Sequence, residues 1–168
     1  MARQKEKMKA LKKVEKTHQV SRKRSPALAP HRRNGGMKVK TIHQTIRFKA
    51  APREIYSILM SSSKHGALTG GKASIPTHTG GMYAIMDGWV HGVNVRLKKN
   101  KDIVQTWVCA DWPNHHASVV HFHFFPMKDG KETKLEFVHQ NVPTFAAKEI
   151  ARGWKQYYWN PLKAMLEK

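Results

Sequence analysis

Cysteine, acidic residues and long apolar runs are scarce in this chain of 168 residues. The single cysteine, Cys109, excludes a disulfide within the chain and fits a reducing compartment. No apolar run reaches the roughly 18–20 residues that a membrane helix needs, and no stretch resembles a signal peptide. We therefore expect a cytoplasmic protein without a membrane partner, and its length suits one domain with its own core.

The scarcity of acids leaves a net charge of +20, and part of that charge lies near the N-terminus. Residues 1–36 contain 12 lysines and arginines but two glutamates, and they have almost no β-branched or aromatic side chains. Such a segment cannot bury enough apolar surface to offset its ordering entropy. We expect a disordered basic N-terminal arm over 1–36 and a folded domain over 37–168.

Three interpretations of the arm stay open. It could be a solvated tail, the product of an upstream start with Met37 as the true start, or an electrostatic contact for nucleic acid. The run Ser21-Arg22-Lys23-Arg24-Ser25 also resembles a nuclear address. No aromatic residue lies among the charges of the arm, so a platform for stacking bases is excluded there.

The last quarter of the chain predicts one long amphipathic helix from Thr144 to Lys168. Thr144 follows Pro143 and is a plausible N-cap, because its hydroxyl can accept from a backbone N–H in the first turn. Apolar side chains recur at steps of three and four residues, which places them on one helix face. These residues are Ala147, Ile150, Ala151, Trp154, Tyr158, Leu162 and Met165.

The region before this helix predicts strands and hairpins. Residues 41–49 alternate as a strand, and a short helix begins at Pro52 and ends in a loop at the serines 61–63 and the glycines 66, 70 and 71. Asp87-Gly88 and Asp129-Gly130 each lie between strand-like runs, which is a strong hairpin signal. Residues 103–112 predict a further strand, but its buried face is ambiguous between Trp107 with Cys109 and Val108 with Ala110.

The second hairpin predicts a register in which paired residue numbers sum to 259. Phe122 then faces Phe137, and Val120 faces His139, all on the face that forms the core. The other face carries His121, His123, Lys134 and Glu136. The order of strand, short helix, antiparallel strands and terminal helix predicts an α+β fold. A curved antiparallel sheet of about six to seven strands should wrap around the long C-terminal helix.

These elements come with a set of ordered motifs over about residues 40–166. The motifs are Ala51-Pro52-Arg53-Glu54-Ile55-Tyr56, Gly80-Gly81-Met82-Tyr83, Asp87-Gly88, Gly92, Ile103-Val104-Gln105-Thr106-Trp107, Asp111-Trp112-Pro113, Thr133-Lys134-Leu135, Val142-Pro143 and the run from Gly153-Trp154 to Tyr158. Together they resemble the C-terminal domain of the activators of the 90-kDa heat-shock protein (HSP90) ATPase, which belongs to the START-like, SRPBCC helix-grip superfamily.

The resemblance implies a sheet gripping the C-terminal helix, with room for a cavity between them. It also implies a co-chaperone role in two-domain members, whose N-terminal domain has no counterpart in residues 1–36. Two functions therefore stay open: a non-enzymatic module that binds a chaperone ATPase, or a binder of a small apolar ligand. We expect no catalytic residues and no cofactor, and the candidate cavity-lining residues are Trp107, Phe122, Phe137, His139, Ile150, Trp154 and Tyr158.

Eleven histidines raise the question of a metal site. His121 and His123 share one strand face, and the register places Glu136 opposite His123. Two imidazoles and a carboxylate could hold zinc, but spacing along the chain secures only the pair of histidines. The sequence therefore favours a cross-strand His–Glu pair on the solvent face, and it predicts no metal.

Overall fold

The computed structural model describes residues 36–167, so the predicted arm, apart from Gly36, lies outside the described residues. The elements follow in the order β1 (Val39–Phe48), α2 (Pro52–Met60), α3 (Ser62–Thr69), β2 (Met82–Ile85), β3 (Val90–Lys98), β4 (Asp102–Cys109), η2 (Pro113–His115), β5 (Ala117–Met127), β6 (Glu132–Pro143), α4 (Ala147–Trp154), η3 (Lys155–Trp159) and α5 (Asn160–Leu166). No helix within 36–167 has both the length and the apolar character to cross a membrane.

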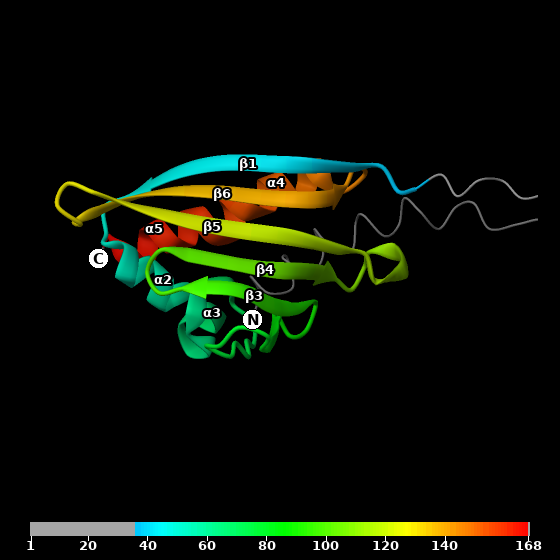
Figure 1. Ribbon diagram of the computed structural model, residues 1–168, viewed down its shortest axis with the longest axis horizontal. Helices are drawn as coiled ribbons and strands as arrows, with labels where there is room; N and C mark the ends of the chain where they lie inside the picture. The colour runs from blue at the N-terminus through cyan, green and yellow to red at the C-terminus, as the bar shows by residue number, and fades with distance from the viewer. Residues whose placement is uncertain (1–35, 168) are drawn as a thin grey trace, which may run out of the picture.

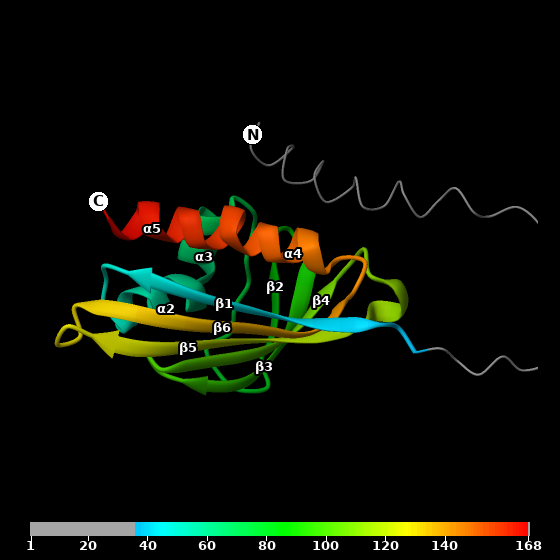
Figure 2. The same ribbon diagram turned by 90° about the horizontal axis from the view of Figure 1, so that it is seen from above.

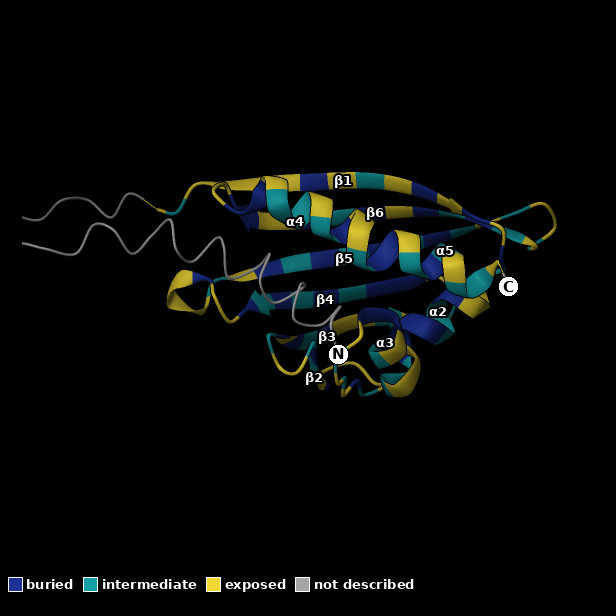
Figure 3. Ribbon diagram, turned by 180° about the vertical axis from the view of Figure 1, so that it is seen from behind, coloured by how far each residue is buried: buried dark blue, intermediate teal, exposed yellow. Residues whose placement is uncertain are grey.

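The strands form one six-stranded antiparallel sheet in the order β1-β6-β5-β4-β3-β2. The helices lie on one face of this curved sheet, and α4, η3 and α5 run along it as one rod (Figures 1 and 2). Buried residues alternate with intermediate and exposed residues along the rod (Figure 3). The predicted α+β helix-grip fold is therefore confirmed, and we call the uncovered side of the sheet its outer face.

The predicted register of the second hairpin is also confirmed. Phe122 pairs with Phe137, and Val120 pairs with His139. The ambiguous strand β4 buries Ile103, Trp107 and Cys109, while Val108 is half-buried on the outer face. The core therefore lies between the inner face of the sheet and the C-terminal rod.

Two local predictions are wrong. Residues 62–69 form helix α3 rather than a loop, because the Ser61 hydroxyl accepts from the backbone N–H of Lys64 and Gly70 ends the helix in the left-handed conformation. The C-terminal helix begins at Ala147, and its N-cap is Ala146, not Thr144. The N–H of Thr144 instead donates to the carbonyl of Lys38, which extends the pairing beside β1.

The first hairpin depends on a close approach at Gly92 in β3. A Cβ on Gly92 would lie 2.1 Å from the carbonyl oxygen of Thr106 and 2.8 Å from the ring of Tyr83. The bare backbone lets the Tyr83 ring pass over this position, and the Tyr83 hydroxyl donates to the same Thr106 oxygen at 2.6 Å. The lack of a side chain at Gly92 therefore allows Tyr83, in the edge strand β2, to form a hydrogen bond with β4.

Candidate functional site

The seam between the C-terminal rod and the sheet is filled by aromatic rings, which we call the grip cluster. Trp154 lies at its centre, with ring centroids 4.4 Å from Phe137, 4.4 Å from Tyr158 and 4.8 Å from Trp107. All of these rings are buried. The grip cluster comprises Trp107, Phe122, Phe137, His139, Trp154, Tyr158 and Trp159.

A directed chain of hydrogen bonds crosses the grip cluster through His139. The indole N–H of Trp154 can only donate, so Nδ1 of His139 accepts at 3.0 Å. The proton of the imidazole is therefore on Nε2, which donates to the Ser118 hydroxyl at 2.8 Å. Ser118 in turn donates to the carbonyl of Trp107 at 2.9 Å. Burial lowers the pKa of His139 to about 3, so this imidazole is neutral at physiological pH.

A second buried histidine fastens the rod to the short helices. The Nδ1 of His65 lies 2.9 Å from the carbonyl of Leu59, an acceptor, so Nδ1 donates. Nε2 of His65 then accepts from the hydroxyl of Tyr158 at 3.1 Å. Burial lowers the pKa of His65 as well, which keeps this imidazole in the neutral form that the two bonds require.

The rod contains a π-helical turn, η3, and the side chain of Gln44 in β1 forms two hydrogen bonds with the rod at this turn. The N–H of Lys155 bonds to the carbonyl of Arg152, three residues back, and the carbonyl of Ala151 accepts from a side chain of β1. The side-chain amide of Gln44 donates to that carbonyl at 2.9 Å, and its oxygen accepts from the indole of Trp159 at 2.5 Å. The wider turn places Trp159 in the core, with its ring stacked 5.6 Å from that of Trp154.

Little space is left between the rod and the sheet. An interior cavity lined by Trp107, Phe122 and Tyr158, among others, measures about 10 Å³, which is room for about one water molecule. A groove of about 50 Å³ opens beside the rod and is lined by Trp107, Ile150, Trp154 and Tyr158 with their neighbours. Phe137 and His139 are buried in the grip cluster but line neither space. A ligand contact for the predicted residues stays a prediction.

The outer face of the sheet holds a second group of polar side chains, and here His123 and Glu136 contact other partners instead of making the expected side-chain contact with each other. His123 does pair in register with Glu136, but Glu136 contacts Lys134 at 2.8 Å. Nδ1 of His123 instead lies 2.5 Å from Oδ1 of Asp102, and Nε2 of His121 lies 3.0 Å from the same oxygen. Asp102, in β4, is buried beneath the two imidazoles.

The contacts made by Asp102, Gln44 and Trp159 do not follow from the sequence. The connection from β4 to β5 is an irregular stretch with a 3-10 turn, which specifies no register, so nothing in the sequence places Asp102 beside His123. Gln44 meets the rod only because β1 pairs with β6 from the far end of the chain. The one available signal for Trp159 was its apolar character at a position off the helical stripe.

Solved structures with the same architecture define the class of this protein. An HSP90 activator from Plasmodium falciparum superposes with a TM-score of 0.72 at 22% identity, covering 79% of this chain and 97% of that one. An Aha1 dimer from Colwellia psychrerythraea superposes with a TM-score of 0.65 at 19% identity, covering 76% and 96%. The described residues therefore have a START-like helix-grip fold.

The family follows from the sequence comparison. The family model "Activator of Hsp90 ATPase homolog 1-like protein" matches residues 49–167, so the chain belongs to that family. The chain is 28% identical over 130 residues to the human activator of 90 kDa heat shock protein ATPase homolog 1, covering 76% of this chain and 38% of the relative. It is 25% identical over 134 residues to mouse homolog 2, covering 79% and 40%. The match thus spans about 40% of each relative's length.

Proposed function

We propose that residues 37–168 form a non-enzymatic protein-interaction module that binds a chaperone ATPase. The curated relatives are named as activators of the 90-kDa heat-shock protein ATPase. The observation that carries the proposal is the filled interior, because the cavity between the rod and the sheet measures about 10 Å³. Pockets that bind small molecules commonly measure about 300–1,000 Å³. A domain with so little interior space offers its outer surface to a partner.

The charge of the surface supports an acidic partner. Residues 37–168 contain 19 lysines and arginines against 9 acidic residues. Arg96 and Lys98 are exposed in β3, and they pair with Val104 and Asp102 on the outer face. Lys148 and Lys155 are exposed on the C-terminal rod. Complementary charge speeds association and selects partners more than it adds affinity.

Binding to a purified 90-kDa heat-shock protein, measured by calorimetry at low and high salt, tests this proposal. We expect weak binding that falls as salt rises, because the attraction between exposed charges is screened. The double variants Arg96→Glu/Lys98→Glu and Lys148→Glu/Lys155→Glu then separate the outer face from the rod. The face whose variant loses binding is the docking face, and ATP hydrolysis measured in parallel reports whether binding also stimulates the enzyme.

Charge-conserving variants are the matched controls. Lys98→Arg and Lys155→Arg keep the charge and should bind as the unaltered protein does. Absence of binding at low salt, or binding that is indifferent to salt and to both charge reversals, would contradict the proposal.

A binder of a small apolar ligand is the second candidate, and the groove beside the rod is the observation that favours it. The groove brings Trp89, Tyr157 and Trp154 to one opening of about 50 Å³. A ligand of ordinary size could enter only if the rod moved away from the sheet, because the space is otherwise filled by the grip cluster. Titration with apolar ligands therefore tests this candidate separately.

A further inference from the structure

Three side chains of the types that can bind metals converge on the outer face of the sheet, on the opposite side from the grip cluster. Asp102 comes from β4, and His121 and His123 come from β5. One donor atom from each of the three lies within 4.8 Å of the donor atoms of the other two. Among residues 36–167, the ion-pair partners of Asp102 are these two histidines.

The strand geometry holds this arrangement in place. Residues two apart on a strand point to the same face, so His121 and His123 are side by side. Asp102 pairs directly with His123, and Val104 pairs with His121. The three donors therefore rest on two hydrogen-bonded central strands of the sheet rather than on loops, which favours a constant geometry.

A bound cation would pair with the buried carboxylate of Asp102. The side chain of Asp102 is 4% exposed, whereas those of His121 and His123 are 34% and 26% exposed. A buried charge is costly unless it is paired, and Asp102 meets two imidazole nitrogens rather than a lysine or arginine. A divalent cation coordinated by the two imidazoles would supply the opposite charge directly.

The donor set and its spacing select the kind of cation. Two imidazole nitrogens and one carboxylate oxygen suit zinc and related transition metals, whereas calcium and magnesium prefer oxygen donors. Zinc–ligand bonds of about 2.0–2.2 Å put tetrahedral ligands roughly 3.3 Å apart. The two nitrogens lie 3.0 Å and 2.5 Å from Oδ1 of Asp102, so modest side-chain rotation would admit the ion. The nitrogens of the two imidazoles away from the ion would keep the ring protons.

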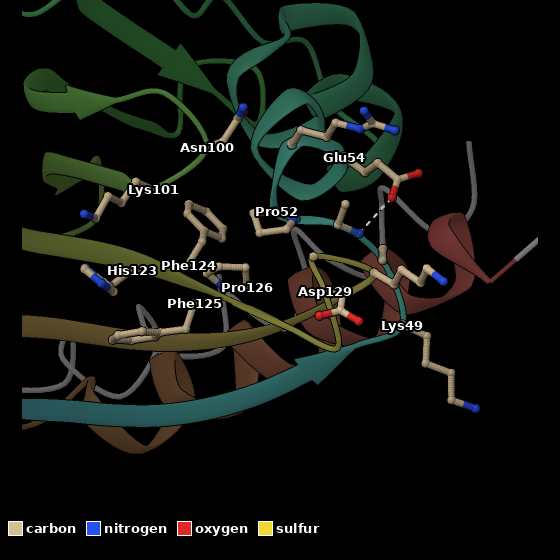
Figure 4. A pocket seen from close by; sticks show the side chains of 15 residues that line it. Lys49, Pro52, Glu54, Asn100, Lys101, His123, Phe124, Phe125, Pro126 and Asp129 are labelled. Carbon is tan, nitrogen blue, oxygen red and sulfur yellow. Dashed lines mark hydrogen bonds between the residues drawn. The ribbon is translucent and has the colours of Figure 1, made fainter.

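We propose that Asp102, His121 and His123 form a binding site for a zinc-class divalent cation on the outer face of the sheet. Three protein donors leave at least one coordination position for water. The half-exposed imidazoles give that position access to solvent, and a broad hollow lies beside His123, between the β5–β6 turn and α2 (Figure 4). The proposed cation site does not depend on the proposed partner binding, so its failure would leave that binding untouched.

Positive charges near the proposed site lower the affinity that we expect for a metal ion. Lys98 pairs with Asp102 from β3, and Lys101 lines the hollow beside His123. These cations weaken the attraction for a metal ion, so we expect modest affinity. Glu136 lies next to His123 on β6 but contacts Lys134, and we therefore do not count it as a ligand.

Titration of the full chain with Zn²⁺ by calorimetry is the first test, with Co²⁺ as a coloured probe of coordination. We expect one site that is lost in His123→Ala and in Asp102→Asn. The loss of affinity should exceed the roughly 10–100-fold that removal of a group orienting a ligand costs. His91→Ala and Glu136→Gln are the matched controls, because both side chains belong to exposed residues of the sheet outside the trio. Both should bind as the unaltered protein does, and Mg²⁺ should not compete.

A second measurement keeps the test decisive if Asp102→Asn fails to fold. The ring resonances of the unaltered protein, followed by NMR during the Zn²⁺ titration, should shift for His121 and His123 and not for His43 or His91. Absence of saturable binding, retention of binding in His123→Ala, or shifts confined to other histidines would overturn the proposal. Equal loss of binding in Glu136→Gln would also overturn it, in favour of the His–Glu set.

Discussion

His139 is a neutral side chain that connects the rod to the sheet through two hydrogen bonds. It accepts from Trp154 and donates to Ser118, and both bonds require one protonated and one bare nitrogen. A second proton would turn the acceptor into a donor and break the bond from Trp154. Burial already disfavours that proton, since it lowers the pKa of His139 to about 3.

This pKa predicts that acid destabilises the fold. An unfolded histidine binds its proton near pH 6.5, so between about pH 6.5 and pH 3 the unfolded state holds more protons and stability rises with pH. His139 alone should cost about 2 kcal/mol between about pH 7 and pH 5. His65, whose pKa is also lowered, acts in the same direction. Urea unfolding at the two pH values measures the loss.

The variant His139→Gln should show a smaller acid loss than the unaltered protein. His43→Gln, at an exposed outer-face position, is the control and should keep the full loss. If His139→Gln and the unaltered protein lose equal stability on acidification, protonation of His139 is not the cause of that loss.

Trp154 is the residue whose loss should cost the most in the grip cluster. Trp154→Ala should lower the free energy of unfolding by about 3–5 kcal/mol, as for large aromatic deletions in cores. The variant also leaves Nδ1 of His139 without its donor. Thermal or urea unfolding measures the change, and Tyr157→Ala, at a half-buried neighbour on the same rod, should cost less. Unchanged unfolding of Trp154→Ala would contradict the packing argument.

At the scale of elements, the π-helical turn and β1 depend on each other. The turn places Trp159 in the core, and Gln44 donates to the Ala151 carbonyl while it accepts from the Trp159 indole. The alignment of strand and rod is thereby specified by one amide rather than by apolar packing alone.

Gln44→Met tests this dependence, because it keeps the length of the side chain and removes both hydrogen bonds. Unpaired buried polar groups cost about 1–3 kcal/mol each, and Gln44 is half-buried, so we expect a loss of about 1–3 kcal/mol in total. Amide exchange should quicken in residues 155–160. Gln140→Met, at an exposed position of β6, is the control and should change stability little. Equal effects of the two variants would contradict a specific role for Gln44.

At the scale of the whole molecule, the cavity between the rod and the sheet measures about 10 Å³, and the proposed interaction module would use the surface of the domain. Titration with a panel of apolar ligands, followed by amide shifts, should therefore produce no cluster of shifts at Phe122, Phe137, Trp154 and Tyr158. Titration with the chaperone should shift residues of the outer surface instead. Saturable shifts at the four aromatic residues would favour the ligand binder over the interaction module.

Features that depend on near neighbours along the chain follow from the local sequence. Alternation along the strands assigned the faces of β5 and β6, and the Asp129-Gly130 turn set their register, because a short turn leaves few ways to pair its strands. The spacing of Trp154, Tyr158 and Leu162 identified the buried side of the rod.

Contacts between distant segments follow instead from the packing of the whole domain. The irregular connection 110–116 permits several registers, so the position of Asp102 under His121 and His123 follows from packing of the whole sheet. The pairing of β1 with β6 likewise brings Gln44 to Ala151 and Trp159, which are more than a hundred residues away. Such contacts depend on the global minimum of burial and hydrogen bonding, because no local turn or periodicity specifies them.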